Sequence, residues 1–288
     1  MTKPPLFVEL CAGTAALSLR LAHPKARPPV SRMGAKTGYA DVILRCLGLY
    51  PGQGAEHYLW CEPDPGVRLL LHAYRDRELA TAAADIIRSW KDEEPRALWE
   101  RLRAEGPAVC PPVDPREVAR FILCQGWTMQ PRGTFRHPWG GFSQSGKHGS
   151  GCDGLTRTGM MERLKDAPTL PATIADDARK VDPPKLAPGV VVYIDPPYLN
   201  TTGYAHAFPR SEWLPVVRRW KDAGALVVVS EAEPIPELVA DGWHTVRIDG
   251  ERRGQKRTFS KQQAEWLTMS EPPKWRPSVQ GQLFGGSR

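Results

Sequence analysis

The strongest chemical signal in this sequence is an acidic residue and two prolines that directly follow an apolar segment. Residues 190–194 read as a buried strand, and Asp195, Pro196, Pro197 and Tyr198 come next. The Asp195 carboxylate and the Pro196 carbonyl can both accept hydrogen bonds from an amine, while the two prolines fix the backbone and remove competing N–H donors. Tyr198 offers a ring on which a base can stack. These residues suit a planar ring whose exocyclic amine must be held with its lone pair free to react.

A simpler interpretation of the same residues is a strand followed by a proline turn, with Asp195 as a helix cap. A second Asp-Pro-Pro sequence offers an internal comparison. It begins at Asp182, no apolar strand precedes it, and Lys185 follows it. We interpret this second sequence as a loop.

The pattern around Asp195 resembles the catalytic motif of the amino-group DNA methyltransferases, and within them the Dam-like adenine-N6 enzymes. The resemblance implies an α/β fold with a Rossmann-like S-adenosylmethionine-dependent methyltransferase sheet, helices on both faces and an inserted target-recognition region. It also implies that Asp195, Pro196, Pro197 and Tyr198 act on an adenine flipped out of double-stranded DNA. The methyl group would pass directly from S-adenosylmethionine to the N6 amine, without a metal.

A strand, a turn of small residues and a helix near the N-terminus resemble the donor-binding loop of the same family. Small residues let a ligand approach the backbone, and the N-terminus of the following helix can hold an anionic group. The family pattern there is Phe-x-Gly-x-Gly; Cys11 stands at the Phe position and Ala15 replaces the second glycine. Glu9 would meet the donor's ammonium group. The resemblance predicts donor contacts from Glu9, Cys11, Ala12, Gly13, Thr14 and Ala15.

Four further residues are candidates for the donor site. Glu62, at the end of an apolar run, is placed to hold ribose hydroxyls, as in nucleotide-binding α/β folds. Asp64 fits the family's spacing almost as well, or else caps a helix. Asp85 is a candidate for a contact with the adenine of the methyl donor, and the alternative is that it is a surface residue. Lys36 ends a segment that resembles the Gly-Gly-Lys segment near the donor pocket of Dam-like enzymes, although there the segment precedes the loop; a plain basic loop is the alternative.

The segment from 125 to 165 is rich in glycine, aromatic and basic residues and has no clear periodicity. It holds six basic and two acidic residues, a large part of the net charge of +7 that the 288-residue chain carries. Aromatic residues interleaved with basic ones suit phosphate contacts and base stacking. An ordinary surface loop is the alternative. The candidates for DNA contact are Trp127, Arg132, Arg136, Trp139 and Lys147, together with Tyr204 after the catalytic motif.

Positioning these residues requires a sheet, and the sequence has the pattern of one. Apolar runs expected to form strands lie at 6–10, 58–61, 190–194 and 225–230, with weaker ones at 243–248 and 264–268. Helical patterns alternate with them at 15–22, 39–47, 67–74, 95–103 and 212–223. The alternation predicts an α/β sheet with helices on both faces. We expect a donor-binding half at 1–124, a target-recognition insertion at 125–185, a catalytic half at 186–270 and a disordered tail at 271–288.

Composition narrows the class of protein. A hydrophobic content of 41% with 10 Trp indicates a globular chain, and 29 Pro with 26 Gly stay below the level typical of low-complexity segments. No apolar run is long enough to span a membrane, and the six Cys form no C-x-x-C pair of the kind that holds zinc. We expect a cytoplasmic protein with reduced thiols, monomeric or weakly dimeric.

The C-terminal tail carries a short peptide that resembles bacterial sliding-clamp binding peptides. Gln280, Leu283 and Phe284 give it the form Gln-x-x-Leu-Phe, so a clamp is a candidate partner beside double-stranded DNA. Two alternatives to an adenine methyltransferase stay open. One is the same fold acting on cytosine N4, an RNA base or a protein amide. The other is a DNA-binding protein with a catalytically silent methyltransferase fold.

Overall fold

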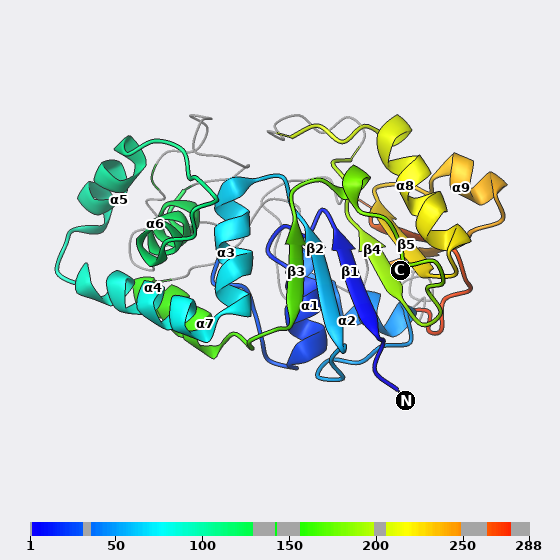
Figure 1. Ribbon diagram of the computed structural model, residues 1–288, viewed down its shortest axis with the longest axis horizontal. Coiled ribbons are helices and arrows are strands. Elements are labelled where there is room, and N and C mark those ends of the chain that lie inside the picture. Colours follow the sequence, from blue (N-terminus) through cyan, green and yellow to red (C-terminus); the bar gives the residue numbers. More distant parts are fainter. Residues whose placement is uncertain are drawn as a thin grey trace, which may run out of the picture.

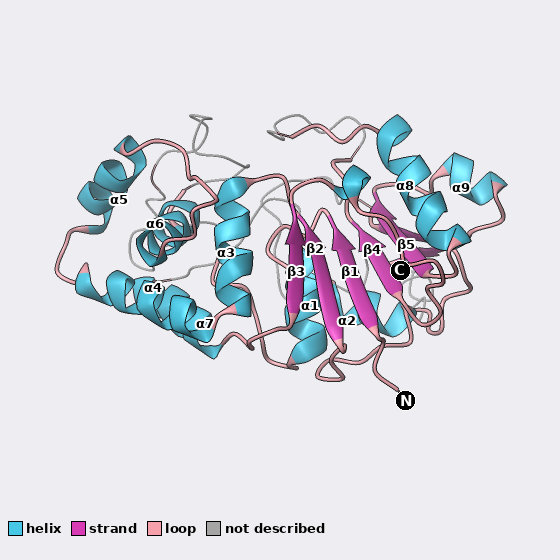
Figure 2. Ribbon diagram, in the orientation of Figure 1, coloured by secondary structure: helices cyan, strands magenta, loops and turns pink. Residues whose placement is uncertain are grey.

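A seven-stranded sheet forms the centre of the molecule. The computed structural model describes residues 2–30, 36–128, 142, 156–198, 206–248 and 264–277. Within them the strand order is β3-β2-β1-β4-β5-β7-β6 (Figures 1 and 2). The strands are β1 (Leu6–Leu10), β2 (His57–Cys61), β3 (Ala172–Ala175), β4 (Val191–Ile194), β5 (Leu226–Glu231), β6 (His244–Arg247) and β7 (Trp266–Met269).

The direction of the strands divides the sheet into a parallel part and an antiparallel edge. β1 pairs in parallel with both β2 and β4, and parallel pairing continues outward to β3 on one side and β5 on the other. β7 runs antiparallel to both β5 and β6. The chain order reverses between β1 and β4, and in open α/β sheets ligands bind outside the carboxyl ends of the strands at such a point.

Alternating side chains give the sheet two buried faces, as the apolar runs predict. On β1, Val8 and Leu10 belong to one apolar cluster with Trp213 and Trp220 of α8 (Arg210–Asp222). Phe7, on the opposite face, belongs to a second cluster that includes residues of α1 (Ala16–Ala22) and α2 (Ala40–Cys46). Figure 1 shows α8 and α9 (Pro236–Ala240) in front of the sheet and α1 and α2 behind it. The predicted α/β sheet with helices is confirmed.

Five helices extend the molecule beyond the β3 edge (Figure 1). They are α3 (Pro65–Arg75), α4 (Arg77–Ser89), α5 (Pro95–Ala104), α6 (Pro115–Gly126) and α7 (Arg157–Asp166). Their N-termini are well defined because Asp64, Asp76, Glu94, Asp114 and Thr156 each accept hydrogen bonds from the first turn. Helical patterns in the sequence predict α3 and α5, whereas α4, α6 and α7 were not predicted. The buried face of α4 consists largely of alanines, which give a weak apolar signal: Ala80, Ala83, Ala84 and Ile87.

The sequence analysis also missed β3, which lies inside the segment expected to be an insertion. β3 is four residues long, forms one edge of the sheet and is only partly buried, so its sequence Ala-Thr-Ile-Ala gives no continuous apolar run. The segment 125–185 therefore contributes a strand to the central sheet as well as α7, which packs on α4 and α6. No helix in the described ranges is both long and apolar enough to cross a membrane.

Candidate functional site

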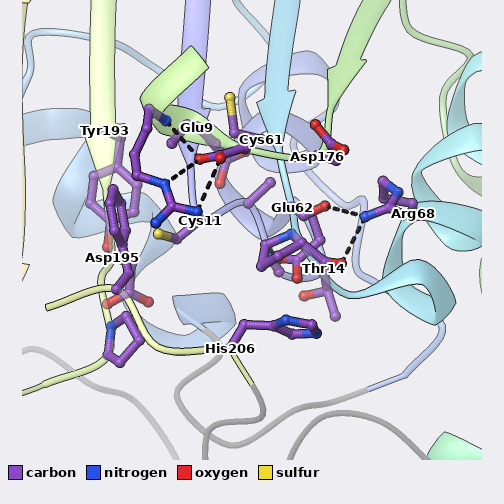
Figure 3. A pocket seen from close by; sticks show the side chains of 18 of the residues that line it. Glu9, Cys11, Thr14, Cys61, Glu62, Arg68, Asp176, Tyr193, Asp195 and His206 are labelled. Atoms are coloured by element: carbon purple, nitrogen blue, oxygen red, sulfur yellow. Dashed lines mark hydrogen bonds and ion pairs between the residues drawn. The ribbon is translucent and has the colours of Figure 1, made fainter. Parts of the chain in front are cut away.

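A cavity of about 550 Å³ opens at the carboxyl ends of β1, β2, β3 and β4 (Figure 3). It lies at the place where the strand order reverses, and it joins the two sequence features that carry the predicted chemistry. The residues that line it come from the loop after β1, from the ends of β2 and β4, from the turn after β3 and from the segment before α8. They include Glu9, Cys11, Ala12, Gly13, Thr14, Lys36, Cys61, Glu62, Arg68, Asp176, Asp177, Tyr193, Asp195, Pro197, His206 and Phe208.

The loop after β1 is a tight turn held by its own backbone. Cys11, Gly13 and Ala15 all have positive φ, at 68°, 51° and 50°. The N–H of Ala12 donates to the Cys61 carbonyl at 2.9 Å, and the N–H of Ala15 donates to the Ala12 carbonyl at 2.8 Å. Left-handed backbone at the non-glycine positions is costly and tends to persist where the surrounding structure fixes it, often at ligand sites.

Glu62 accepts a hydrogen bond from another backbone N–H group of this loop. It follows β2, is buried, and its Oε2 accepts the Gly13 N–H at 2.8 Å while Oε1 accepts the Asp64 N–H at 3.0 Å. Arg68 of α3 donates to the carbonyls of Glu62 and Pro63, at 2.9 and 2.7 Å, and so holds the same turn from the other side. Glu62 therefore reaches the cavity as the sequence predicts, in an orientation fixed by backbone N–H groups.

Glu9 points from β1 toward α1 and fills the position that an external anion could take. Its Oε1 accepts the backbone N–H of Ser18 at 2.9 Å and the Ser18 hydroxyl at 2.5 Å; Ser18 in turn accepts a hydrogen bond from Trp60. Burial raises the pKa of Glu9 to about 7, although the Ser18 hydrogen bonds lower it. Glu9 thus takes one N–H group of the first turn of α1, so the protein itself supplies a carboxylate there.

Asp195 lies directly after β4 and forms a close ion pair across the cavity. Lys36 Nζ is 2.7 Å from Oδ1 and 2.8 Å from Oδ2 of Asp195. The pKa of Asp195 is raised to about 6, mainly by burial; Lys36 lowers it, and the carboxylates of Glu265 and Glu231 raise it. At neutral pH the group is thus mostly ionised and can act only as an acceptor.

Lys36 lines the same cavity as the loop after β1 and also contacts Asp195. It begins a short 3₁₀ helix (Lys36–Gly38), lines the cavity, and directs its ammonium at Asp195. Its Nζ also lies 5.0 Å from the centre of the Tyr198 ring and 3.9 Å from Glu265 Oε1. Lys36 is thus a partner of Asp195, and its role in donor binding stays a prediction.

Tyr198 is held by two residues that the sequence analysis did not identify. Its hydroxyl donates to Glu265 Oε1 at 2.5 Å and lies 3.4 Å from Ser230 Oγ, and Ser230 donates to the same carboxylate oxygen. Glu265 and Ser230 are both buried. Nothing in the local sequence distinguishes Glu265, a single acidic residue before a short strand; only the antiparallel return of β7 beside β5 brings it to the motif.

Two candidates for the donor site lie elsewhere. Asp64 is the N-cap of α3: its Oδ1 accepts the N–H groups of Gly66 and Val67 at 2.9 and 3.4 Å, which is the capping alternative. Asp85 lies on α4 with a half-exposed side chain that pairs with Lys165 at 3.0 Å and Arg88 at 3.2 Å, so it is a surface residue. Neither residue lines the cavity.

Acidic residues that line the cavity near the donor loop come instead from the turn after β3. Asp176 and Asp177 follow the edge strand that the sequence analysis missed. Asp177 is tied to Arg179 by hydrogen bonds of 2.8 and 3.0 Å, and Arg179 also bonds Glu212 at 2.6 Å. Because a parallel sheet brings the carboxyl ends of its strands to one edge, recognition of β3 would have revealed these residues.

Trp127 is a core residue and not a surface contact for DNA. Its side chain is 2% exposed, its ring packs edge-to-face against Phe142 at 6.3 Å, and the Arg157 guanidinium lies 5.3 Å from its centre. Arg157 itself donates to the carbonyls of Trp90 and Glu93 and fastens α7 to the helical region. The other predicted contacts lie outside the described residues: Arg132, Arg136, Trp139, Lys147, Tyr204 and the peptide containing Gln280, Leu283 and Phe284.

The sequence matches no protein-family model, and no curated protein is significantly similar to it.

Proposed function

We propose that this protein is an S-adenosylmethionine-dependent DNA methyltransferase that acts on the N6 amine of adenine. One observation carries the proposal: a single cavity at the reversal of strand order is lined both by the loop after β1 with Glu9 and Glu62 and by Asp195 of the Asp-Pro-Pro-Tyr motif. A donor site and an amine-holding site that share one cavity are what a direct group transfer requires.

The loop after β1 favours a nucleoside donor without phosphates over a nucleotide. In phosphate-binding α/β loops the backbone N–H groups and the helix N-terminus face the anion. Here the N–H groups of Ala12, Gly13 and Ala15 are used inside the protein, and Ser18 in the first turn of α1 is taken by Glu9. The carboxylates of Glu9 and Glu62 instead suit a positively charged ligand with ribose hydroxyls, which describes S-adenosylmethionine.

We assign the parts of the donor to residues of the cavity by their chemistry. Glu62, at the end of β2, would accept the ribose hydroxyls, and Glu9 would face the ammonium group of the methionine end. Asp176, after β3, replaces Asp85 as the candidate acceptor for the amine of the donor adenine. S-adenosylmethionine, when bound, supplies an electrophilic methyl group on sulfur.

Asp195 and its neighbours would prepare the acceptor. An adenine flipped from the duplex presents an N6 amine whose lone pair is delocalised into the ring. Hydrogen bonds from this amine to the ionised Asp195 and to the Pro196 carbonyl favour a pyramidal nitrogen that can form the new N–C bond as the donor's S–C bond breaks. Tyr198, fixed by Glu265 and Ser230, would stack on the ring. The electron pair of the S–C bond stays on sulfur, which gives S-adenosylhomocysteine. The nitrogen is acidic once it has attacked, so it loses its proton to the Asp195 carboxylate or to water and no strong base is needed.

The order of the strands supports this assignment to a Rossmann-like methyltransferase. The five parallel strands have the order 3-2-1-4-5, as in dinucleotide-binding α/β folds, and an antiparallel β7 takes the sixth place. The antiparallel edge serves the proposed site directly, since β7 brings Glu265 to Tyr198.

The test is transfer of labelled methyl groups to duplex DNA, followed by nucleoside analysis. We expect methyladenine from the wild type and none from Asp195→Ala, which should still bind S-adenosylmethionine in calorimetry. Asp182→Ala is the matched control because it alters the second Asp-Pro-Pro sequence, where the Asp182 side chain is 81% exposed. Methylcytosine, or label only on RNA or protein, would show that the acceptor is a group other than the adenine amine. No transfer together with no donor binding would refute the proposal.

A further inference from the structure

We propose that Glu265 is a positioning residue that receives the Lys36 ammonium when the target amine takes its place at Asp195. This inference rests on the proposed function, because it describes how the acceptor reaches a site that another cation already occupies. It assigns a role to a buried carboxylate that lies well outside the motif in sequence.

Lys36 occupies the same atoms that the target amine needs. Both carboxylate oxygens of Asp195 are within 2.7 and 2.8 Å of its Nζ. An N–H donor from adenine can bond Asp195 fully only if the ammonium moves away or shares an oxygen. The Lys36 ammonium also lies over the Tyr198 ring, 5.0 Å from its centre. A base stacked on this ring would need the same space.

A buried ammonium cannot simply leave one carboxylate without meeting another. The Lys36 side chain is 7% exposed, and removing one partner of a buried ion pair leaves an uncompensated charge that is strongly destabilising. A second carboxylate that the Lys36 ammonium can reach by a short rotation of its side chain would lower this free-energy cost. Glu265 Oε1 is that group: it lies 3.9 Å from Nζ and its side chain is 8% exposed.

Other acidic groups near Asp195 are bound by different partners. Glu9 is held by Ser18, and Glu231 accepts the Ala232 N–H at 2.9 Å and lies 3.8 Å from Arg210. Among the described residues, the Glu265 carboxylate accepts hydrogen bonds from two neutral groups, the hydroxyls of Tyr198 and Ser230. Glu265 is therefore a carboxyl group within reach of Lys36, and it also holds the ring that would stack on the base.

The test is a double-mutant cycle between Glu265 and Lys36. Glu265→Gln removes the charge but keeps an amide oxygen that can accept the hydroxyls of Tyr198 and Ser230. Methyl transfer is measured with saturating donor on the alkaline plateau of each variant's pH profile, so that Asp195 is ionised in all variants. Glu265→Gln should lower kcat/KM for duplex DNA by about tenfold or more while leaving the Kd of the donor unchanged. Adding Glu265→Gln to Lys36→Met should change kcat/KM by less than about twofold.

Two controls separate this role from a structural one. Glu271→Gln removes a half-exposed carboxylate just after β7 and should leave kcat/KM unchanged. Glu265→Asp keeps the charge and should restore most of the activity, and thermal melts of every variant report folding.

The inference would be overturned if Glu265→Gln lowered kcat/KM equally in the wild type and in Lys36→Met. It would also be overturned if Glu265→Gln left kcat/KM unchanged, as Glu271→Gln should. In both cases the proposed function would stand. If Glu265→Gln does not fold, Glu265→Asp decides: a folded Glu265→Asp that keeps the charge but loses about tenfold or more in kcat/KM would overturn the inference. A wild type that transfers no methyl group would overturn both.

Discussion

The ion pair between Lys36 and Asp195 predicts how activity depends on pH. Asp195 has a pKa of about 6 in the presence of Lys36, and burial is the main cause of the rise from its ordinary value. The proposed role requires the ionised carboxylate. Activity of the wild type should therefore be present above this value and fall as the pH drops through about 6. The profile of kcat/KM against pH reports this group in the free enzyme.

Lys36→Met removes the ammonium and should move the acid limb of that profile to higher pH. Two unit charges about 3 Å apart attract by roughly 5 kcal/mol at an effective dielectric constant of about 20. In proteins, an opposite charge in contact lowers a carboxyl pKa by about 1–3 units. Loss of Lys36 should therefore raise the pKa of Asp195 from about 6 to roughly 7–9. With a value near 8, about a tenth of the carboxylate is ionised at pH 7, so kcat/KM falls about tenfold and recovers at about pH 9.

The assay is methyl transfer to duplex DNA across this pH range, with Lys274→Gln as the control. Lys274 is 57% exposed and pairs only loosely with Glu271 at 3.4 Å, so the same loss of one positive charge should leave the profile in place. An acid limb of Lys36→Met that stays near pH 6, or moves lower, would refute the argument that the ammonium stabilises the charged form of Asp195.

Two further predictions concern residues whose roles the structure changed or sharpened. Glu9 has a pKa raised to about 7 by burial, so its charge appears as the pH rises through that value; the affinity for S-adenosylmethionine should rise with pH in the wild type and be weaker and flat in Glu9→Gln, measured by calorimetry. An equal pH dependence in both proteins would contradict the pairing of Glu9 with the donor's ammonium group. Trp127 is fully buried against Phe142 and Arg157, so Trp127→Ala should lower the free energy of unfolding by about 3–5 kcal/mol in urea titrations. A stable Trp127→Ala variant that has lost only its affinity for DNA would restore the interpretation of this residue as a DNA contact.

Periodicity and local motifs predicted the parts of the sheet with strong signals. β1, β2, β4 and β5 follow from short apolar runs, because strands buried on both faces leave continuous apolar segments in the sequence. The motif at Asp195 and the turn after β1 were both placed at strand ends for the same reason. β3 and α4 were missed because a partly exposed edge strand and an alanine-lined helix carry little apolar contrast.

The sequence by itself determined that Asp195 ends a buried strand, that Glu9 and Gly13 belong to one turn region and that Glu62 ends another apolar run, since each of these facts depends on neighbours in the chain. Only the tertiary structure decided which distant groups meet them. Lys36 and Asp195 are 159 residues apart, and Tyr198 and Glu265 are 67 apart. Such contacts depend on the order and direction of the strands, which local patterns do not encode.

The electrostatic character of the site was likewise a property of the folded chain. A carboxylate has an ordinary pKa in the unfolded sequence, and burial beside a chosen partner changes it. Burial raises the pKa of both Glu9 and Asp195, and the positions of Ser18, Lys36 and Glu265 decide by how much. Residue types thus indicate which chemistry is available, while the packing of the sheet and of its antiparallel strand β7 determines which ions face each other in the cavity.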